Sequence, residues 1–291
     1  MRKEITVDGI LNVYKPKEWT SHDIVAKIKK ITGQKVGHTG TLDPLATGVL
    51  IVCTNHDTKL VDILTSKNKE YIATMRLGIQ TDTGDITGNV IKKASYKVTK
   101  DQIIKVLNSF LGSSTQTVPI YSAVKINGKK LYEYARNGEE VTLPTREINI
   151  SNIELLDYHD DLIKFKVTVS KGTYIRSLIE DIGKALQTVA TMEDLVRTKQ
   201  GHYKIEDSYT LEDIKNDNYK PIPLNVVLED YPTYNLNENE YFKVKNGSKM
   251  FLNIDDKIAT LLYNNKPIAL YRKENDIYRV YKMLEINNDN N

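Results

Sequence analysis

The chain has 291 residues, of which 40% are hydrophobic and 27% are charged. These proportions exclude collagen-like, mucin-like and largely disordered chains. A single cysteine excludes a disulfide framework and a zinc finger, and it is compatible with a reducing cytosol. No apolar run approaches the roughly 20 residues of a membrane-spanning helix, and the first residues lack the apolar core of a signal peptide. We therefore expect a cytoplasmic protein without a membrane partner.

Neither the net charge nor the aromatic content shows whether the protein binds a nucleic acid. The formal net charge is only +3, so any basic surface must come from the placement of charges. The 18 tyrosines are more suggestive, because a tyrosine ring can stack on a base. For most of them, half-buried positions on strands are the better explanation.

In the first part of the chain, strands and helices alternate. Strands are predicted at residues 9–14, 48–53 and 69–79. Thr20 or Ser21 caps a helix between the first two strands, and Gly33 ends it. Thr99 and Gln102 form a capping box that opens a second helix, with Gly112 at its end.

Later segments complete an α+β pattern without regular βαβ alternation. Alternating apolar residues predict a strand at 163–169, and a helix follows over 178–186. Prolines punctuate 216–232, where we place a domain boundary. Short strands are then predicted at 257–263, 268–272 and 277–284. We expect a catalytic domain over 1–230 with a mixed, mostly antiparallel sheet flanked by helices, and a small β-barrel or sandwich over 231–291.

The densest cluster of candidate functional residues is the segment GHTGTLDPLATG, residues 37–48. Its glycines permit sharp turns, and Asp43 is its one side chain that is ionised at neutral pH. An isolated Asp-Pro is usually a helix cap, with Pro44 at the first helical position. Here the loop precedes a buried strand, which is a place where functional sites occur, so we keep Asp43 as a candidate.

Other familiar motifs are absent from the sequence. It contains no phosphate-binding P-loop and no Gly-x-Gly-x-x-Gly, and its five histidines are scattered. Cys53 lies inside an apolar run and is expected to be a buried hydrophobic residue. We therefore expect neither a catalytic metal nor a cofactor.

Two further segments contain candidate residues. SKGTYIR, residues 170–176, follows a strand and opens a helix, and an arginine there could hold Asp43 ionised; the alternative is an ordinary arginine on a first helical turn. The segment 121–136 interleaves basic residues and tyrosines, which suits a nucleic-acid surface as well as a solvated hairpin and helix. Its basic residues are Lys125, Lys129, Lys130 and Arg136.

Together these segments resemble the TruB family, the bacterial tRNA pseudouridine-55 synthases. The resemblance runs over about 9–205 and rests on motifs in order: KP at 15–16 with TS at 20–21, GHTGTLDPLATG at 37–48, TK at 58–59, KEY at 69–71, RLG at 76–78, TDT at 81–83, PIYSAVK at 119–125, GKKLYEYAR at 128–136 and KGTYIR at 171–176. Glu18 departs from the pattern, which has glycine there. The segment 231–291 matches weakly, and its VKNG at 244–247 resembles the start of the family's PUA-type RNA-binding domain.

The resemblance implies a pseudouridine synthase core followed by a PUA-like β-domain. It implies isomerisation of one uridine in the TΨC loop of tRNA, at position 55, after the base is flipped out of its stack. No cofactor, metal or protein partner is implied, and we expect a monomer.

The resemblance also assigns roles to single residues. Asp43 matches the catalytic aspartate, acting as a nucleophile at the base or the sugar carbon, or as a base at the sugar. Arg176 resembles its partner, Tyr71 the ring that stacks on the target base, and Lys59 a helper near the carboxylate. The remaining assignments are Tyr174 and Leu195 as walls of the uridine pocket, and His38 as the residue that fills the space left by the flipped nucleotide.

Two alternatives remain open at this stage. One is a uridine isomerase that works inside an RNA-guided complex; such relatives usually have longer tails, so a chain of this length favours the stand-alone enzyme. The other is a non-catalytic RNA-binding or RNA-folding module. The intact set of Asp43, Tyr71 and Arg176 argues against that module, because a protein without catalytic demand could have lost it.

Overall fold

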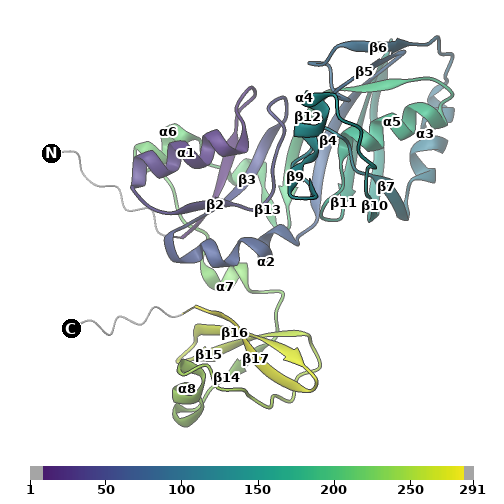
Figure 1. The fold of residues 1–291 in the computed structure, drawn as a ribbon. Coiled ribbons are helices and arrows are strands. Elements are labelled where there is room, and N and C mark those ends of the chain that lie inside the picture. Colours follow the sequence, from purple (N-terminus) through teal and green to yellow (C-terminus); the bar gives the residue numbers. More distant parts are fainter. Residues whose placement is uncertain (1–8, 285–291) are drawn as a thin grey trace.

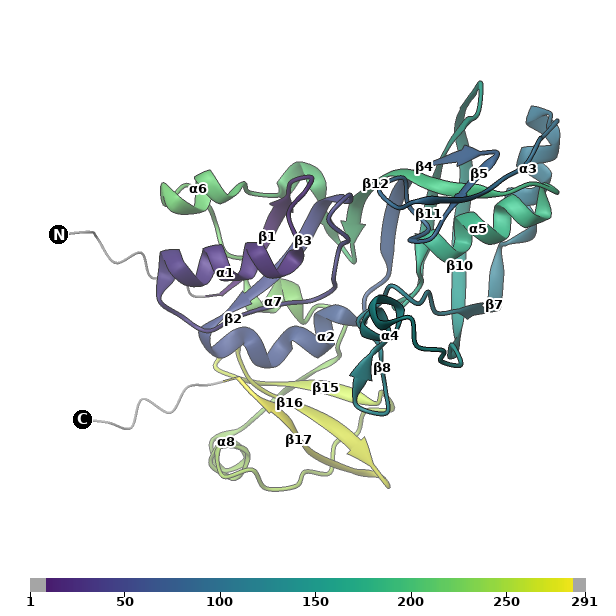
Figure 2. The ribbon, with the colours of Figure 1, turned by 45° about the horizontal axis from the view of Figure 1, so that its top comes forward.

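The computed structural model describes residues 9–284 (Figures 1 and 2). Its main feature is a nine-stranded sheet in the order β1-β3-β12-β4-β11-β10-β7, with β2 paired to β3 and β13 paired to β12. Only the β3–β12 pairing in this sheet is parallel. The expected α+β fold with a mixed, mostly antiparallel sheet is confirmed.

The strands of this sheet are β1 (Ile10–Lys15), β2 (Val36–His38), β3 (Thr47–Thr54), β4 (Lys69–Leu77), β7 (Gly112–Thr117), β10 (Thr145–His159), β11 (Leu162–Val169), β12 (Ala190–Gln200) and β13 (Tyr203–Lys204). Two small hairpins project from it. They are β5 (Ile79–Thr81) with β6 (Val90–Lys93), and β8 (Lys125–Ile126) with β9 (Lys129–Lys130).

Helices cover both ends of the sheet. They are α1 (Ser21–Thr32), the 3-10 helix η1 (Asn55–Leu60), α2 (Val61–Thr65), α3 (Lys100–Ser109), α4 (Leu131–Asn137), α5 (Ile175–Ala185), the 3-10 helix η2 (Ile205–Asp207), α6 (Leu211–Lys215) and α7 (Leu224–Val227). Helix α1 packs Ile24 and Ile28 against β1 and β3. Helices α3 and α5 share a second hydrophobic cluster with β4, β10, β11 and β12 (Figure 1).

Local sequence signals explain where several elements begin and end. Thr20 caps α1 through a capping box with Asp23, and Gly33 ends it in the left-handed region at φ 68°. The predicted capping box of Thr99 and Gln102 opens α3 as expected. Gly112, expected to end this helix, instead begins strand β7, and Phe110 is the C-cap.

The C-terminal segment forms one four-stranded sheet in the order β14-β15-β16-β17. Its elements are β14 (Thr233–Asn235), α8 (Glu238–Lys245), β15 (Ile258–Tyr263), β16 (Lys266–Glu274) and β17 (Ile277–Met283). The three predicted strands are confirmed. The expectation of a barrel or a two-sheet sandwich is wrong for the described residues, because they form one open sheet and Val244 of α8 packs against its face with Tyr271 and Tyr278.

The two sheets are joined by shared apolar packing. Leu270 and Leu284 of the C-terminal segment belong to the same buried cluster as Val49, Leu60 and Val227. Tyr281 adds a hydrogen bond of 2.5 Å from its hydroxyl to Asp62 Oδ2. The C-terminal sheet therefore rests on α2 and α7 (Figure 2).

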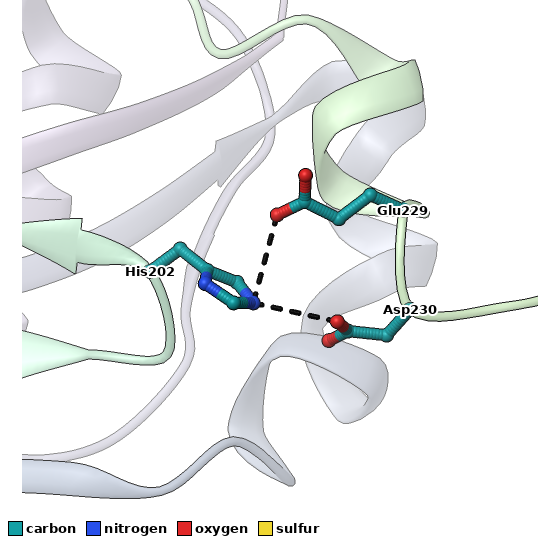
Figure 3. A group of neighbouring side chains, drawn as sticks. All are labelled: His202, Glu229 and Asp230. Carbon is teal, nitrogen blue, oxygen red and sulfur yellow. Dashed lines mark hydrogen bonds and ion pairs between the residues drawn. The ribbon is translucent and has the colours of Figure 1, made fainter.

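An exposed cluster of charges lies just before this junction. His202 Nε2 lies 3.5 Å from Glu229 Oε1 and 3.3 Å from Asp230 Oδ1 (Figure 3). Asp230 also forms an ion pair with Lys67. Imidazole and carboxylates are metal ligands in other proteins, but here an ammonium group already neutralises Asp230. We interpret the cluster as a hydrogen bond from His202 and an ion pair from Lys67 that meet at Asp230 and connect the end of α7 to the β12–β13 turn.

Candidate active site

Two hydrogen bonds and a close strand crossing hold the loop that carries Asp43. The Leu42 N–H donates to Ser21 Oγ at the start of α1, over 2.8 Å. Gln200 of β12 donates to Thr39 Oγ1 over 2.6 Å. Gly48 sits at φ 104°, where a Cβ atom would lie 2.2 Å from the Arg197 carbonyl oxygen. Only glycine fits this crossing of β3 and β12, so the position of the loop depends on it.

Asp43 does not cap a helix. Residues 43–46 form a turn in which the Ala46 N–H donates to the Asp43 carbonyl over 3.0 Å. The helix-cap explanation for the Asp-Pro pair is therefore wrong. The carboxylate, with its side chain 33% exposed, is left for other contacts.

Arg176 holds this carboxylate with two parallel contacts. Its Nε lies 2.9 Å from Asp43 Oδ2, and its Nη2 donates to Oδ1 over 3.3 Å. The guanidinium also donates to the carbonyls of Thr83 and Tyr121, over 2.9 Å each. Its side chain is only 6% exposed. A guanidinium fixed by four acceptors fixes the orientation of the carboxylate.

The backbone of α5 places Arg176 for this contact. Tyr174 is the N-cap of α5, and Gln116 of β7 binds both its N–H and its carbonyl, over 2.8 and 3.0 Å. The Arg146 guanidinium lies 5.2 Å from the centre of the Tyr174 ring. The start of α5 is thereby tied to the neighbouring strands β7 and β10.

Apolar residues surround the site on the sheet side. Tyr71 and Leu195, which are 7% and 5% exposed, share a cluster with Leu42 and Leu45, the residues that flank Asp43 and Pro44. Leu195 pairs with Ala73, the residue two places after Tyr71 on β4. The structure thus brings Asp43 and Arg176 into contact from segments that are far apart in the sequence, and it places Tyr71 and Leu195 in the cluster that holds the neighbours of Asp43.

The structure separates Lys59 from Asp43, contrary to the expected position of Lys59. Strand β3 lies between them, since Asp43 precedes β3 and Lys59 follows it on η1. The Lys59 Nζ lies 2.9 Å from His56 Nδ1, and burial lowers its pKa. Eight residues of extended chain keep it at the other end of the strand.

Lys15 occupies the place expected for Lys59. It is fully buried, and its Nζ donates to the carbonyls of Trp19, Pro16 and Pro44 over 2.6, 2.9 and 3.4 Å. Burial lowers its pKa to about 8, while the charge of Asp43 acts in the opposite direction. Lysine followed by proline at the end of the first strand was visible in the sequence, but nothing there showed that it turns toward Asp43.

Two further predicted residues lie around the loop. His38 ends β2, and its Nδ1 accepts a hydrogen bond of 3.3 Å from the Gly40 N–H. Burial lowers its pKa, and the charge of Arg197 lowers it further. Glu18, where the family pattern has glycine, adopts φ 68°, the left-handed conformation that glycine would favour.

The basic segment forms the β8–β9 hairpin and helix α4, as one of its two interpretations predicted. Lys125 and Arg136 are exposed, whereas Lys129 donates to Glu139 over 2.6 Å and Lys130 to the Tyr132 hydroxyl over 3.2 Å. Cations lie over rings here, with Arg136 5.3 Å from the centre of the Tyr132 ring. The hairpin follows Tyr121, whose carbonyl binds Arg176, so it projects beside the site.

Comparison with known proteins identifies the class of this arrangement. A solved Cbf5–Nop10–Gar1 complex contains a chain that is 29% identical, with a TM-score of 0.74 over 94% of this chain and 84% of that chain. An H/ACA RNP bound to a substrate RNA containing 2′-deoxyuridine gives 27% identity and a TM-score of 0.72, over 96% and 86%. The fold is that of a pseudouridine synthase.

Sequence comparison identifies the family. TruB family pseudouridylate synthases match through their N-terminal domain at residues 28–175, and the C-terminal domain of tRNA pseudouridylate synthase B matches residues 176–228. The tRNA pseudouridine synthase B of Clostridium tetani is 45% identical over 95% of this chain and 92% of that protein. The chain belongs to the TruB family.

Proposed function

We propose that the protein isomerises uridine to pseudouridine in the TΨC loop of tRNA, at position 55. The observation that carries this proposal is the pair of contacts that Arg176 makes with the Asp43 carboxylate. Membership of the TruB family and the 45% identity to a tRNA pseudouridine synthase B support the same substrate.

Asp43 is the catalytic residue in this proposal. As an ionised carboxylate it has three routes, namely attack on the base, attack on the sugar C1′ or removal of a sugar proton. Each route breaks the N1–C1′ bond and forms the C5–C1′ bond. The C5 hydrogen leaves as a proton and N1 gains one, so the reaction is a balanced isomerisation without an oxidant or reductant.

The surrounding residues bind and position the nucleotide. Tyr71 stacks on the flipped base, Leu195 and Tyr174 form the walls of its site, and His38 fills the space that it leaves in the RNA loop. The track of Lys125, Lys129, Lys130 and Arg136 contacts phosphates. A base in a loop costs least to extrude, which suits a TΨC-loop target.

We also propose the division of labour along the chain. Residues 1–230 perform the chemistry, and the PUA-like segment 231–291 adds affinity for tRNA. The protein acts as a cytoplasmic monomer without a protein partner. In each of the two solved complexes named above, the matching chain is longer than this one. The relative from Clostridium tetani, by contrast, matches this chain over nearly its full length.

The test is incubation with unmodified tRNA labelled with tritium at C5 of uridine, with no added cofactor. Formation of the C5–C1′ bond releases the label to water. We expect release of one equivalent, mapped to the TΨC loop. No release would refute the proposal, and release only with an added guide RNA would favour the RNA-guided alternative.

A further inference from the structure

Helix α5, which carries Arg176, begins without a side-chain cap of its own. Tyr174 is its N-cap residue and forms no side-chain capping bond, whereas α1 and α3 both open with capping boxes. Arg176 is the second residue of α5. Its backbone position therefore depends on whatever else holds this end of the helix.

Gln116 of the edge strand β7 holds this end from outside the helix. Gln116 is 3% exposed, and its side-chain amide accepts from the Tyr174 N–H over 2.8 Å and donates to the Tyr174 carbonyl over 3.0 Å. The next residue of β7 adds a backbone contact, because Ser177 Oγ donates to the Thr117 carbonyl over 3.0 Å. Residues on both sides of Arg176 are therefore bound to β7.

Arg146 of β10 holds the turn that precedes α5. It is the cross-strand partner of Gln116. Its Nη1 donates to the Gly172 carbonyl over 3.2 Å, and its guanidinium lies 5.2 Å from the centre of the Tyr174 ring. Gly172 has φ 82°, and a Cβ atom there would lie 2.7 Å from Arg146 Nη1, so glycine permits this approach. Gln116 and Arg146 thus hold the segment 172–174 together.

The chain that follows Gln116 also fixes the other end of Arg176. The Tyr121 carbonyl accepts from Arg176 Nη2 over 2.9 Å. Segment 116–121 therefore holds both the backbone around Arg176 and its guanidinium. The contacts of that guanidinium with Asp43 are 2.9 and 3.3 Å long, and a misplacement of about 1 Å in a reacting site can lower the rate about 100-fold.

We propose that Gln116 is a positioning residue for the isomerisation, with Arg146 as its partner on the neighbouring strand. Gln116 fixes the backbone from which the Arg176 guanidinium reaches Asp43. Since it binds both polar groups of one residue, it fixes the rotation of that residue as well as its position. Gln116 is buried and acts through Arg176, without contacting the RNA. This inference rests on the proposed function, because it concerns the rate of that reaction.

The experiment uses Gln116→Met in the full-length protein, a change that keeps the length of the side chain and removes both hydrogen bonds. Single-turnover tritium release at saturating tRNA should fall about 10- to 100-fold, with tRNA affinity within about threefold of wild type. Hydrogen exchange of the Tyr174 amide should become about tenfold faster or more. In the Arg176→Lys background the same change should cost less than about threefold, because the contact that Gln116 positions is already broken.

Thr188→Val is the matched control. Thr188 is 7% exposed, and its Oγ1 donates to the Ser95 carbonyl over 3.2 Å, just past the other end of α5. The control should lower the free energy of unfolding but keep the rate of tritium release. If Gln116→Met does not fold, Arg146→Gln changes a less buried member of the pair and should lower the rate about threefold or more.

Three results would each overturn the inference. They are a rate for the folded variant within about twofold of wild type, unchanged exchange of the Tyr174 amide, and an equal loss of rate in the wild-type and Arg176→Lys backgrounds. Absence of tritium release from the wild-type protein is a different result, and it would refute the proposed function together with this inference.

Discussion

Replacing Arg176 by lysine tests whether geometry, and not charge alone, holds Asp43. The guanidinium makes two contacts with the carboxylate, at 2.9 and 3.3 Å, and two with the carbonyls of Thr83 and Tyr121. An ammonium is a single nitrogen and cannot reproduce this fork. We assume that it keeps one contact with Asp43 and loses the other three.

The magnitude follows from those losses. One charge-assisted hydrogen bond contributes about 1.5–3 kcal/mol. If it acts on the reacting carboxylate in the transition state, kcat falls roughly 10- to 150-fold. The two carbonyls that lose a donor lower the free energy of unfolding by about 2 kcal/mol together.

The assay is the single-turnover rate of tritium release at saturating tRNA, with denaturant unfolding of the same variant. Arg76→Lys is the matched control, because Arg76 also contacts two carboxylates, those of Asp161 and Glu193, at the other end of β4. It should lose stability but keep its turnover. A rate for Arg176→Lys within twofold of wild type, or an equal loss in Arg76→Lys, would refute the reasoning.

Three further predictions concern binding and stability. Replacing both Lys129 and Lys130 by alanine should make the slope of log affinity against log salt shallower by about 1.4 without changing which base is modified. An unchanged slope would mean that the hairpin is a solvated surface that does not contact the RNA. Burial lowers the pKa of Lys15 from 10.5 to about 8, so between these two pH values the unfolded chain binds more protons than the folded chain. The free energy of unfolding should therefore rise with pH in this range, relative to that of Lys15→Met. Unfolding at fixed salt measures it. Deleting 231–291 should weaken tRNA affinity more than turnover at saturating tRNA, and it should lower the unfolding temperature because Leu270 packs on the catalytic part. A truncated protein that folds and binds but does no chemistry would contradict the proposed division of labour.

The sequence predicted the elements whose apolar pattern is regular. Strand β11 alternates buried and partly exposed residues along most of its length, and α1 carries both of its caps in the sequence. The central strand β12 was missed, because ATMEDLVRTKQ contains four charged residues and no clean alternation. It buries Arg197 by giving the guanidinium carbonyl partners, which no periodicity reveals.

Two more elements were missed for different physical reasons. Strand β10 is 15 residues long, and two irregularities in its pairing with β11 shift its alternation. Helix α8 is polar on most of its surface, with Val244 as its one buried residue. Its capping box of Asn237 and Glu240 was the available signal.

The candidate site was predictable as a set of residues but not as a geometry. Asp43 and Arg176 could be paired from motifs, and the structure brings them into contact. Lys59 was misplaced because its neighbourhood depends on the direction of β3. Lys15 and the carbonyls of Thr83 and Tyr121 went unassigned, because a contact with a backbone atom leaves no mark in the sequence.

The most direct test of the central claim is the rate of Asp43→Asn on unmodified tRNA. Asparagine keeps the shape of the side chain but is neither a nucleophile nor a base. We expect no measurable tritium release, with tRNA affinity within about tenfold of wild type, since the phosphate contacts are intact. A variant that keeps more than about one hundredth of the wild-type rate would contradict the account and assign the chemistry to another group.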